Sequence, residues 1–341
     1  MKPVINIRDV AKQAGVSVGT VSRVLNGHPS VTPLKQQRVK EAIAALNYKP
    51  DTFAQSLRRG TSRTIGVIIP DLRNPFFADL IQNIEIRARS LGYSVLFVSS
   101  DEDAATEASL VETLAHRRVD GIILAPSNEV HQVETLKRLP IVIVDRAIEG
   151  HACVAADHRA GSRLALDYLT SIGHRHIACV AGPTESVVAR ARLSGFLDVM
   201  APYFRAEGLQ AEDYIAHAAF DYLGGRDAAE RLLANSKHRP TAIFACSDQQ
   251  AIGVLRVAAD RGLSVPHDLS VVGFDGITLA DLVAPRLTTV VQPVAQIADA
   301  AVAMLLDRKG GLREAESELF ACSLAKRESC APLKNQAASQ Q

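Results

Sequence analysis

The sequence predicts an all-α helix-turn-helix head followed by an α/β body of two lobes built on parallel sheets. Three observations lead to this fold class. The first 63 residues hold eleven Lys and Arg against three acidic residues and carry +8, while the remaining residues carry −7. Short helical patterns separated by a tight glycine turn fill the basic segment. From residue 64 onward, strand-like apolar runs alternate with amphipathic segments, the pattern of parallel sheets covered on both faces.

Length and composition indicate a globular protein of more than one domain. A chain of 341 residues is too long for one ordinary core. The amino-terminal residues carry no export signal, and no apolar stretch approaches the roughly 20 residues that cross a bilayer. Five scattered cysteines without a C-x-x-C pair favour buried, reduced thiols over disulfides or metal ligands. We therefore expect a cytoplasmic protein without membrane contact.

The first two helices of the head are predicted from their caps. Asn6 can cap a helix over 7–14, because its side chain can accept a hydrogen bond from a free N–H of the first turn. Gly15 then ends this helix. Ser17 can cap a second helix over about 18–25 in the same way, which leaves a turn of three residues between the two helices.

Pro33 opens the third helix of the head, at the first helical position, where its missing N–H costs nothing. Val39, Ile43 and Leu46 form the apolar stripe of this helix, and Asn47 suits a left-handed stop. Three short helices can equally form a protein-protein module. The local charge of +8 favours DNA as the partner, because a basic head on an acidic chain is the footprint of phosphate binding.

The head carries two gapless runs, Asp9-Val10-Ala11-Lys12-Gln13-Ala14-Gly15-Val16-Ser17 and Thr20-Val21-Ser22-Arg23-Val24-Leu25-Asn26. Together they closely resemble the head of the LacI/GalR family of bacterial repressors, and the similarity continues over nearly the whole chain. The resemblance implies a helix-turn-helix domain over 1–50, a hinge linker over 51–61 and a ligand-binding and dimerisation domain over 62–341. We therefore expect a repressor of a carbohydrate-utilisation operon that binds palindromic double-stranded operator DNA as a homodimer.

By this resemblance the second helix enters the major groove, and the DNA-contacting positions of the head are Ser17, Val18, Gly19, Thr20, Ser22, Arg23 and Asn26. Arg23 suits guanine, because its fork matches two acceptors on the base edge. Val18 offers only an apolar surface, for instance to a thymine methyl group. Gly19 departs from the longer polar side chains of some family members. Thr20 and Ser22 could also be ordinary helix residues without a DNA contact.

The linker over 51–61 contains a helical pattern shorter than the ~12–15 residues that an isolated helix needs in water. It should therefore order only when two copies pair on DNA. Leu57 matches the leucine that the family wedges into the minor groove at the operator centre, and we assign Arg58 beside it to the same DNA contact. The alternative is that Leu57 is a packing residue in a tether.

The body contains seven strand-like runs, over 65–70, 94–98, 121–125, 141–144, 177–181, 242–245 and 269–274. Amphipathic helical segments lie near 75–91, 105–117, 158–172, 187–200, 222–235 and 248–261. This long alternation indicates two lobes. The first is expected over about 62–162 and 292–321, and the second over about 163–291 and 322–331, before a tail at 332–341.

Polar residues recur just past the predicted strand ends: Asp71 and Asn74 with Phe76 and Phe77, then Asp145-Arg146, Ser247-Asp248 and Asp275. Ligands bind outside the carboxyl ends of parallel strands, so these residues should meet in one cleft. Carboxylates and amides pair with hydroxyl groups, Arg donates a fork and a ring covers the C–H face of a sugar, which favours a polyhydroxylated ligand. Singly, Asn74 could merely cap a helix and Asp275 could merely stabilise a turn.

The body also resembles periplasmic sugar-binding proteins of type I, and ribose-type binders in particular. The residues at pentose-contacting positions are Asn74, Phe76, Phe77, Asp145, Arg146, Arg192, Phe220, Asp275 and Gln292. Ser247 stands at a further position of this set, where Asn is usual, and its shorter side chain leaves room for a bulkier substituent or a water. The resemblance implies a periplasmic-binding-protein-like body whose effector is a monosaccharide or a sugar-like polyol.

Enzyme and metal sites are not expected. The sequence has no G-x-S-x-G, no P-loop and no dinucleotide fingerprint after a strand, so we expect no catalysis and no cofactor. His174 and His176 have a spacing that could serve zinc, but without a third ligand we expect solvated loop histidines. The alternatives that stay open are an exported sugar-binding protein and an intracellular sugar-binding protein or sugar enzyme without operator specificity.

Overall fold

The computed structural model describes residues 5–25, 28–48, 61–127, 139–146, 148, 153–234, 239–307 and 317–333. The chain divides into two compact units, Met1–Ser62 and Arg63–Gln341, and each is described by itself. Three residues with a predicted DNA contact, Asn26, Leu57 and Arg58, lie outside the described residues, as does the linker up to residue 60.

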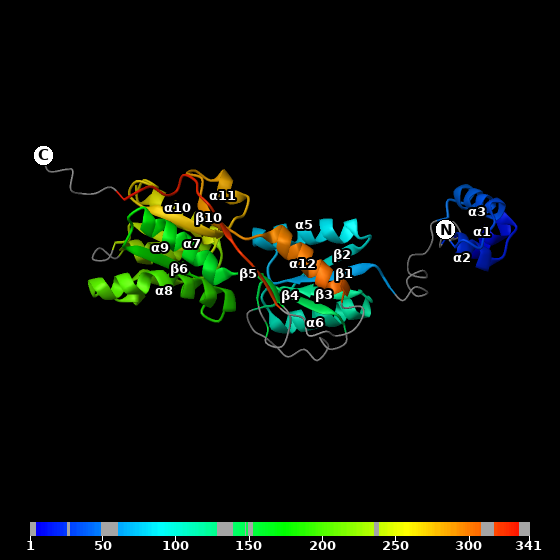
Figure 1. The fold of residues 1–341 in the computed structure, drawn as a ribbon, viewed down its shortest axis with the longest axis horizontal. Helices are drawn as coiled ribbons and strands as arrows, with labels where there is room; N and C mark the ends of the chain where they lie inside the picture. Colours follow the sequence, from blue (N-terminus) through cyan, green and yellow to red (C-terminus); the bar gives the residue numbers. More distant parts are fainter. Residues whose placement is uncertain are drawn as a thin grey trace. The chain divides into compact units, whose positions relative to one another are not determined.

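The head consists of the three predicted helices, α1 (Ile7–Ala14), α2 (Val18–Leu25) and α3 (Pro33–Ala45), drawn in blue in Figure 1. Asn6 and Asp9 form a capping box at the start of α1. The Asp9 side chain accepts a hydrogen bond from the N–H of Asn6, and the Asn6 side chain accepts one from the N–H of Arg8. Gly15 ends α1 with a φ of 63°, a left-handed conformation that glycine adopts without steric cost. The helices enclose a small core of their own: Val10, Ala11, Ala14, Val21, Val39 and Ala42.

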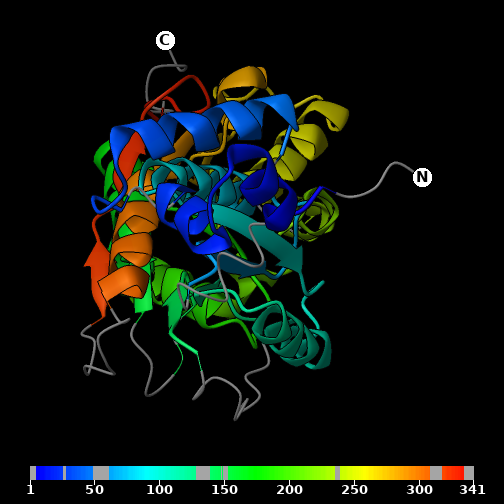
Figure 2. The same cartoon turned by 90° about the vertical axis from the view of Figure 1, so that its right-hand side faces the viewer.

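The first lobe of the body is built on a six-stranded sheet in which every pair of strands is parallel. Its order is β11 (Glu318–Phe320), β5 (Cys153–Ala156), β4 (Ile141–Val144), β3 (Gly121–Leu124), β1 (Thr64–Ile69) and β2 (Ser94–Ser99). Helices α5 (Pro75–Ser90) and α12 (Val294–Asp307) cover one face, and α6 (Ala104–His116) covers the other. The turned view shows the same separation of α6 from α5 and α12 (Figure 2).

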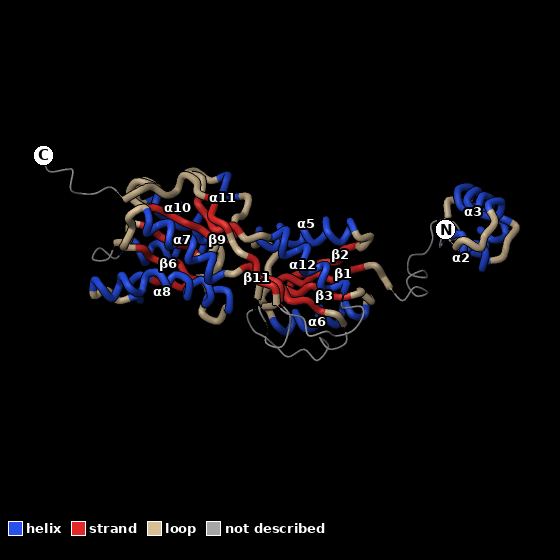
Figure 3. Tube along the Cα trace, in the orientation of Figure 1, coloured by secondary structure: helices blue, strands red, loops and turns tan. Residues whose placement is uncertain are grey.

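The second lobe is built on a second six-stranded sheet, whose strands lie between helices in Figure 3. Its order is β12 (Ser323–Ala325), β10 (Thr288–Val291), β9 (Ser270–Asp275), β8 (Ala242–Ala245), β6 (Ile177–Ala181) and β7 (Ile215–His217). All pairs are parallel except β10 with the edge strand β12, which is antiparallel. Its helices are α7 (His158–Ser171), α8 (Val187–Glu207), α9 (Tyr222–Ala234), α10 (Asp248–Asp260), the short α11 (Leu279–Leu282) and a 3₁₀ turn at Ala211–Tyr214.

The chain passes between the two lobes three times: after β5, after β10 and after β11. Because each passage leaves the carboxyl end of a strand in one sheet, these connections lie on the side of the sheets where ligands bind in parallel α/β folds. The two lobes share a continuous apolar core that includes residues of both sheets. The predicted fold class is therefore confirmed, with one antiparallel edge strand added.

Helix α8 is longer than predicted, since it runs to Glu207 rather than ending near 200. Pro202 lies inside it, and proline in a helix interior costs about 3 kcal/mol. Met200 and Phe204 lie on either side of this proline and are almost completely buried. Burial of these side chains against the second lobe offsets the lost hydrogen bond and keeps the chain helical.

The cysteines are all free thiols, as expected. Three are buried and two are half-buried. Burial raises the pKa of the Cys153 thiol to about 12, so it is protonated at neutral pH and a poor nucleophile. In the part of the chain that the structure describes, no helix is both long and apolar enough to cross a membrane.

Candidate functional site

Helix α2 presents one face to the core of the head and the other to solvent. Ser17 caps it, because its hydroxyl oxygen accepts a hydrogen bond of 3.1 Å from the backbone N–H of Thr20. Val21 is completely buried and fixes the rotation of the helix about its axis. Arg23 lies about half a turn around the helix from Val21 and is exposed, and Val18 is exposed in the first turn of the helix.

The predicted DNA-contacting residues of α2 divide into two groups by exposure. Ser17, Val18, Gly19 and Arg23 are exposed, and Val18 is a large apolar residue 37% exposed on a very small domain. Thr20 and Ser22 are half-buried, and the Thr20 hydroxyl lies 3.0 Å from the Ser17 hydroxyl. Val18, Gly19 and Arg23 are therefore exposed to a partner, whereas the hydroxyl groups of Ser17 and Thr20 already lie within hydrogen-bond distance of each other.

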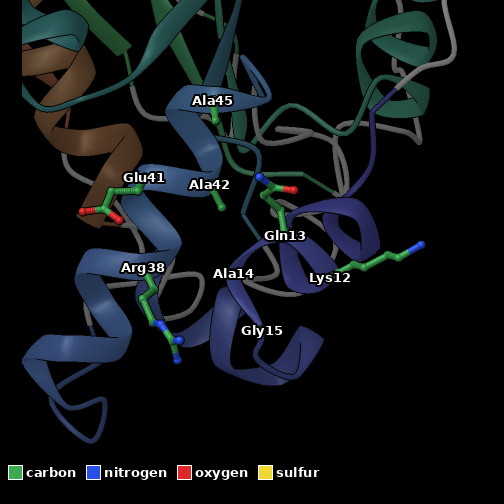
Figure 4. Close-up of a pocket in the computed structure, with 8 residues that line it drawn as sticks. All are labelled: Lys12, Gln13, Ala14, Gly15, Arg38, Glu41, Ala42 and Ala45. Atoms are coloured by element: carbon green, nitrogen blue, oxygen red, sulfur yellow. The ribbon is translucent and has the colours of Figure 1, made fainter.

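A groove of about 340 Å³ lies between α1 and α3, and none of the predicted DNA-contacting residues lines it. Its lining residues are Lys12, Gln13, Ala14, Gly15, Arg38, Glu41, Ala42 and Ala45. Figure 4 shows Arg38 and Glu41 projecting from α3, while Lys12 points away from that helix. The groove is lined by both basic and acidic side chains, so its charge does not indicate a phosphate-binding site.

In the body, residues from both lobes converge on one cavity, here named the interlobe cavity. It is lined by Asn74, Phe76, Phe77, Asp145, Arg146, Val188, Arg192, Phe220 and Asp275. Eight of the ten residues that the sequence placed in a ligand site are therefore brought together. Val188 joins them without having been predicted, because an apolar residue in the first turn of a helix gives no signal of its own.

The aromatic side of the cavity comes from the start of α5. Asn74 caps this helix by accepting a hydrogen bond of 3.1 Å from the N–H of Phe76. Asn74 is therefore a helix cap and a lining residue of the cavity at the same time. The rings of Phe76 and Phe77 pack edge to face with centroids 5.1 Å apart. Both are nearly buried, which holds their orientation.

Asp145 and Arg146 follow β4 directly and are both more than nine-tenths buried. Asp145 has a φ of 65°, so the strand end turns sharply there. The His158 ring lies between the lobes, with Nε2 3.4 Å from Asp145 Oδ1 and Nδ1 3.4 Å from the guanidinium of Arg192. Burial opposes ionisation of Asp145, but the hydrogen bond to His158 and the charges of Arg146 and Arg192 outweigh it and lower the pKa of this carboxyl.

Arg192 reaches the cavity from α8 and is held on every side. Nη2 lies 3.0 Å from Asp275 Oδ1, and Nη1 donates to the carbonyl of Cys246. The guanidinium carbon lies 3.9 Å from the centroid of the Phe274 ring, a cation–π contact. Burial raises the pKa of the Asp275 carboxyl. The charge of Arg192 and the hydrogen bond from Gln292 act in the opposite direction, because they favour the charged form of Asp275.

Two predicted ligand residues, Ser247 and Gln292, do not line the interlobe cavity. The Ser247 hydroxyl caps α10 and donates to the carbonyl of Phe220, 3.2 Å away, so it holds the loop that carries this ring. Gln292 donates to Asp275 over 2.8 Å. Both residues therefore support side chains that line the cavity.

Three buried atoms in or beside the cavity are poorly satisfied by the described residues. Asp145 Oδ1 has only the 3.4 Å contact with His158 Nε2, Arg146 Nε has only the 3.8 Å ion pair with Asp145 Oδ2, and Gln292 Oε1, just outside the lining, has no hydrogen bond. A buried polar atom left unpaired costs about 1–3 kcal/mol, so such atoms mark the places where a ligand or water belongs. They offer two acceptors and one donor. The free volume of the cavity is about 20 Å³, room for about one water molecule, so a larger ligand requires the residues around the cavity to move.

Sequence reasoning missed His158 and Glu102, which orient the charged residues of the cavity. Glu102 accepts from both terminal nitrogens of Arg146 at 2.8 Å. Neither has a local signal, because Glu102 reads as a loop residue and His158 as the first residue of a helix. Glu102 meets Arg146 because the loops after β2 and β4 lie at the same edge of one sheet, whereas His158 lies between Asp145 of the first lobe and Arg192 of the second.

The histidine pair considered for zinc has another role. His174 is buried rather than solvated, with Nδ1 2.9 Å from the Thr241 hydroxyl and Nε2 3.1 Å from the carbonyl of Ala331. It pins the carboxyl-terminal segment to the second lobe, and its expected exposure was wrong. Within the described ranges, no three His, Cys, Asp or Glu residues are placed to hold a metal ion.

Comparison with known proteins follows the same division of the chain. Residues 6–51 match the family model of bacterial regulatory proteins of the lacI family, and residues 166–330 match the periplasmic binding protein-like domain. Catabolite control protein A of Priestia megaterium is 37% identical over 308 residues, covering 88% of this chain and 91% of that protein. The ribose operon repressor of Escherichia coli (strain K12) is 36% identical over 310 residues, covering 89% and 92%.

Among solved structures, the lac repressor dimer bound to operator and the anti-inducer ONPF superposes with a TM-score of 0.86 at 30% identity. The superposition covers 96% of this chain and all of that chain. The relatives are more than 30% identical over most of both chains, and the head and the body have the expected folds. These findings confirm the resemblance to the LacI/GalR family that the sequence of the head indicates. The chain belongs to the LacI family of bacterial regulatory proteins and is a DNA-binding transcription regulator with an effector-binding body.

Proposed function

We propose that this protein represses a carbohydrate-utilisation operon, and that a monosaccharide or polyol in the interlobe cavity controls its affinity for the operator. The observation that carries the proposal is the convergence of two carboxylates, two guanidinium groups and three aromatic rings from both lobes on one cavity. Hydroxyl groups donate to carboxylates and accept from guanidinium groups, and rings cover the C–H face of a sugar. The likeness to a ribose operon repressor supports a sugar of pentose size.

For DNA, we assign α2 to the major groove of each half-site. Arg23 donates to guanine, Val18 packs against a thymine methyl and Gly19 faces the base edges. Thr20 and Ser22 contact phosphate or flanking bases, and Ser17 belongs to the same interface. The exposure of Arg23 and Val18 supports these roles. We assign Asn26 to the same interface. We further propose that residues 51–61 form a hinge in which Leu57 enters the minor groove and Arg58 contacts the backbone.

The regulation we propose links the cavity to the hinge. A homodimer places two heads on a near-palindromic operator, and the effector changes how the two lobes of each subunit are closed. Because the free volume of about 20 Å³ is far below the size of a sugar, binding requires a rearrangement around the cavity, and we propose that the lobes supply it. Coupling of this kind is typically about 1–3 kcal/mol, or roughly 5–150-fold in operator affinity. For a sugar cavity we propose release of DNA on binding.

We propose that the cavity binds without catalysis and that the protein acts in the cytoplasm, where its DNA target lies. The pair that could suggest acid-base chemistry, Asp145 and Arg146, is held by His158 and Glu102 respectively. These partners suit a rigid recognition site. Two of the proteins compared above, the ribose operon repressor and the lac repressor, are repressors, which agrees with a binding function.

Two measurements test the proposal. Selected operator fragments should bind the purified protein with an affinity that falls steeply with salt, and Arg23→Ala should weaken the preferred sequence far more than random DNA. A thermal-shift screen of monosaccharides and polyols should then find compounds that raise the melting temperature by mass action and weaken operator binding. Equal binding of all duplex sequences, with and without these compounds, would refute the regulator and leave a sugar-binding protein or sugar enzyme.

A further inference from the structure

Arg146 is the basic residue of the first lobe in the interlobe cavity, and its charge is already engaged. Its Nη1 and Nη2 donate to Glu102 Oε2 and Oε1, each at 2.8 Å, in a two-pronged ion pair. Nη1 also donates to the carbonyl of Pro126 at 3.0 Å. The Arg146 side chain is 6% exposed, while that of Glu102 is 38% exposed at the outer end of the pair. The remaining nitrogen, Nε, makes no hydrogen bond among the described residues and lies 3.8 Å from Asp145 Oδ2, in a second ion pair.

Glu102 is held in place by the backbone around it. It follows β2 with a φ of 60°, and its N–H donates to the carbonyl of Pro70 over 2.9 Å. The next residue, Asp103, caps α6. Since both neighbouring segments are anchored, the carboxylate of Glu102 stays beside Arg146 at little entropic cost, which makes it a fixed charge rather than a mobile surface group.

Each of the two arginines among the described lining residues is paired with a carboxylate. Arg146 is matched by Glu102, and Arg192 is matched by Asp275 at 3.0 Å. Asp145 adds a further carboxylate whose pKa is lowered by His158 and the two arginines, against the effect of burial. The buried carboxyl of Glu107 also lies near Arg146 and accepts from the N–H of Ser127. Burial raises the pKa of the Asp275 and Glu107 carboxyls, so the surroundings of the cavity are neutral when both are protonated and negative when they are ionised.

We propose that Glu102 is a positioning residue that makes the interlobe cavity reject anions and accept only uncharged ligands. A phosphate or carboxylate group entering the cavity would compete with Glu102 for Arg146 and would place a second negative charge within a few ångströms of it. A hydroxyl group needs only the Arg146 Nε, which makes no hydrogen bond among the described residues, as donor and the neighbouring Asp145 carboxylate as acceptor. The effector class proposed above is thereby narrowed to uncharged sugars and polyols, excluding sugar phosphates and sugar acids; this refinement rests on the proposed sugar-binding function.

The first test uses inorganic phosphate and needs no knowledge of the effector. Thermal-shift titrations of full-length wild type and Glu102→Gln are run at constant ionic strength set with chloride. Gln keeps the shape and one acceptor but removes the charge. Phosphate should not stabilise wild type, whereas Glu102→Gln should bind it at least about tenfold more tightly, the effect expected from removing one repulsive charge nearby. Equal phosphate binding by the two proteins would overturn the proposal.

Three further variants separate position from charge. Glu102→Asp keeps the carboxylate and should still reject phosphate. Glu230→Gln removes a carboxylate from a surface pair with Arg261 and should behave as wild type. In Glu102→Gln/Arg146→Met, the gained phosphate binding should disappear, because it acts through Arg146. If the double variant binds phosphate as well as Glu102→Gln does, the route through Arg146 is wrong.

The same proteins are then titrated with D-ribose and D-ribose 5-phosphate. Wild type should prefer the neutral sugar, and Glu102→Gln should shift the ratio of the two affinities toward the phosphate by at least about tenfold. An unchanged ratio contradicts the proposal. If neither these compounds nor any other sugar or polyol binds wild type, the proposed sugar effector fails, while the phosphate titration still decides whether Glu102 excludes anions.

Discussion

Arg192 on α8 and Asp275 at the end of β9 lie 3.0 Å apart, from Nη2 to Oδ1, and each side chain is only 5% exposed. The two residues are 83 positions apart in the chain, and their pair joins helix α8 to strand β9. Asp275 has a φ of 118°, a conformation that residues with a side chain rarely adopt, so its position depends on surrounding bonds. The ion pair with Arg192 and the hydrogen bond from Gln292 hold the Asp275 carboxyl in this position.

Asp275→Asn should weaken binding of the effector by at least about tenfold and leave operator affinity in the absence of effector nearly unchanged. Asn is chosen because removing one partner of a buried ion pair altogether costs about 3–5 kcal/mol. Calorimetric titration and operator binding measure the two affinities. The matched control is Asp198→Asn, which breaks an exposed pair with Arg159 in the same lobe. Normal binding and response in Asp275→Asn would place the effector elsewhere.

Asp248 supports Asp275 from behind and should make stability depend on pH. It is completely buried and accepts from the N–H groups of Gly276 and Ile277 at 2.8 and 2.9 Å. Burial, together with the nearby charge of Asp275, raises the pKa of this carboxyl from 3.8 to about 8. Between these values the folded protein retains a proton that the unfolded chain has lost.

The stability that this proton provides is therefore complete below pH 3.8 and is lost as pH rises to about 8, by at most about 1.4 kcal/mol per pH unit. Asp248→Asn should remove this dependence, because an amide does not ionise in this pH range. The Asn side-chain oxygen can still accept both backbone hydrogen bonds. Urea unfolding from pH 5 to pH 8.5 should show the variant gaining on wild type as pH rises. A constant difference between the two proteins across this range would show that Asp248 ionises normally.

Gly19→Ala should stabilise the head by about 0.5–1 kcal/mol, since glycine inside a helix is that much less favourable than alanine. A Cβ at this position would meet only the Ser17 hydroxyl oxygen at 3.8 Å. Hydrogen exchange of the head's amides in the full-length protein measures the change. Gly15→Ala is the opposite control, because its φ of 63° should make alanine destabilising by about 1–2 kcal/mol. The same sign for both variants would contradict this account.

Gly195→Ala should destabilise the body by about 1–3 kcal/mol through overpacking. A Cβ there would overlap the carbonyl oxygen of Arg159 and approach the Ser162 Cβ to 2.8 Å, so α7 and α8 would have to separate. The melting temperature of the body should fall accordingly. Ser194→Ala, the neighbouring substitution on the same helix, should stay within about 0.5 kcal/mol of wild type. Comparable melting of the two variants would mean that the helices can separate freely.

The sequence alone determined those features whose causes are local. Asn6, Ser17 and Pro33 start the three head helices because a cap acts through bonds to the next few residues. Asp145 and Asp275 were placed at a ligand site because apolar runs end directly before them, and parallel strands end at one edge. Both line the cavity in the structure.

Only the tertiary structure decided features that depend on distant segments. The edge strands β11 and β12 hold three residues each, too few to show a period, and form because partner strands offer free backbone groups. Helix α8 continues past Pro202 because buried side chains outweigh a local cost. Glu102 meets Arg146 across 44 residues through the closing of loops at the sheet edge. Local patterns therefore specify elements and strand ends, whereas the partners that set charge and orientation arise from packing.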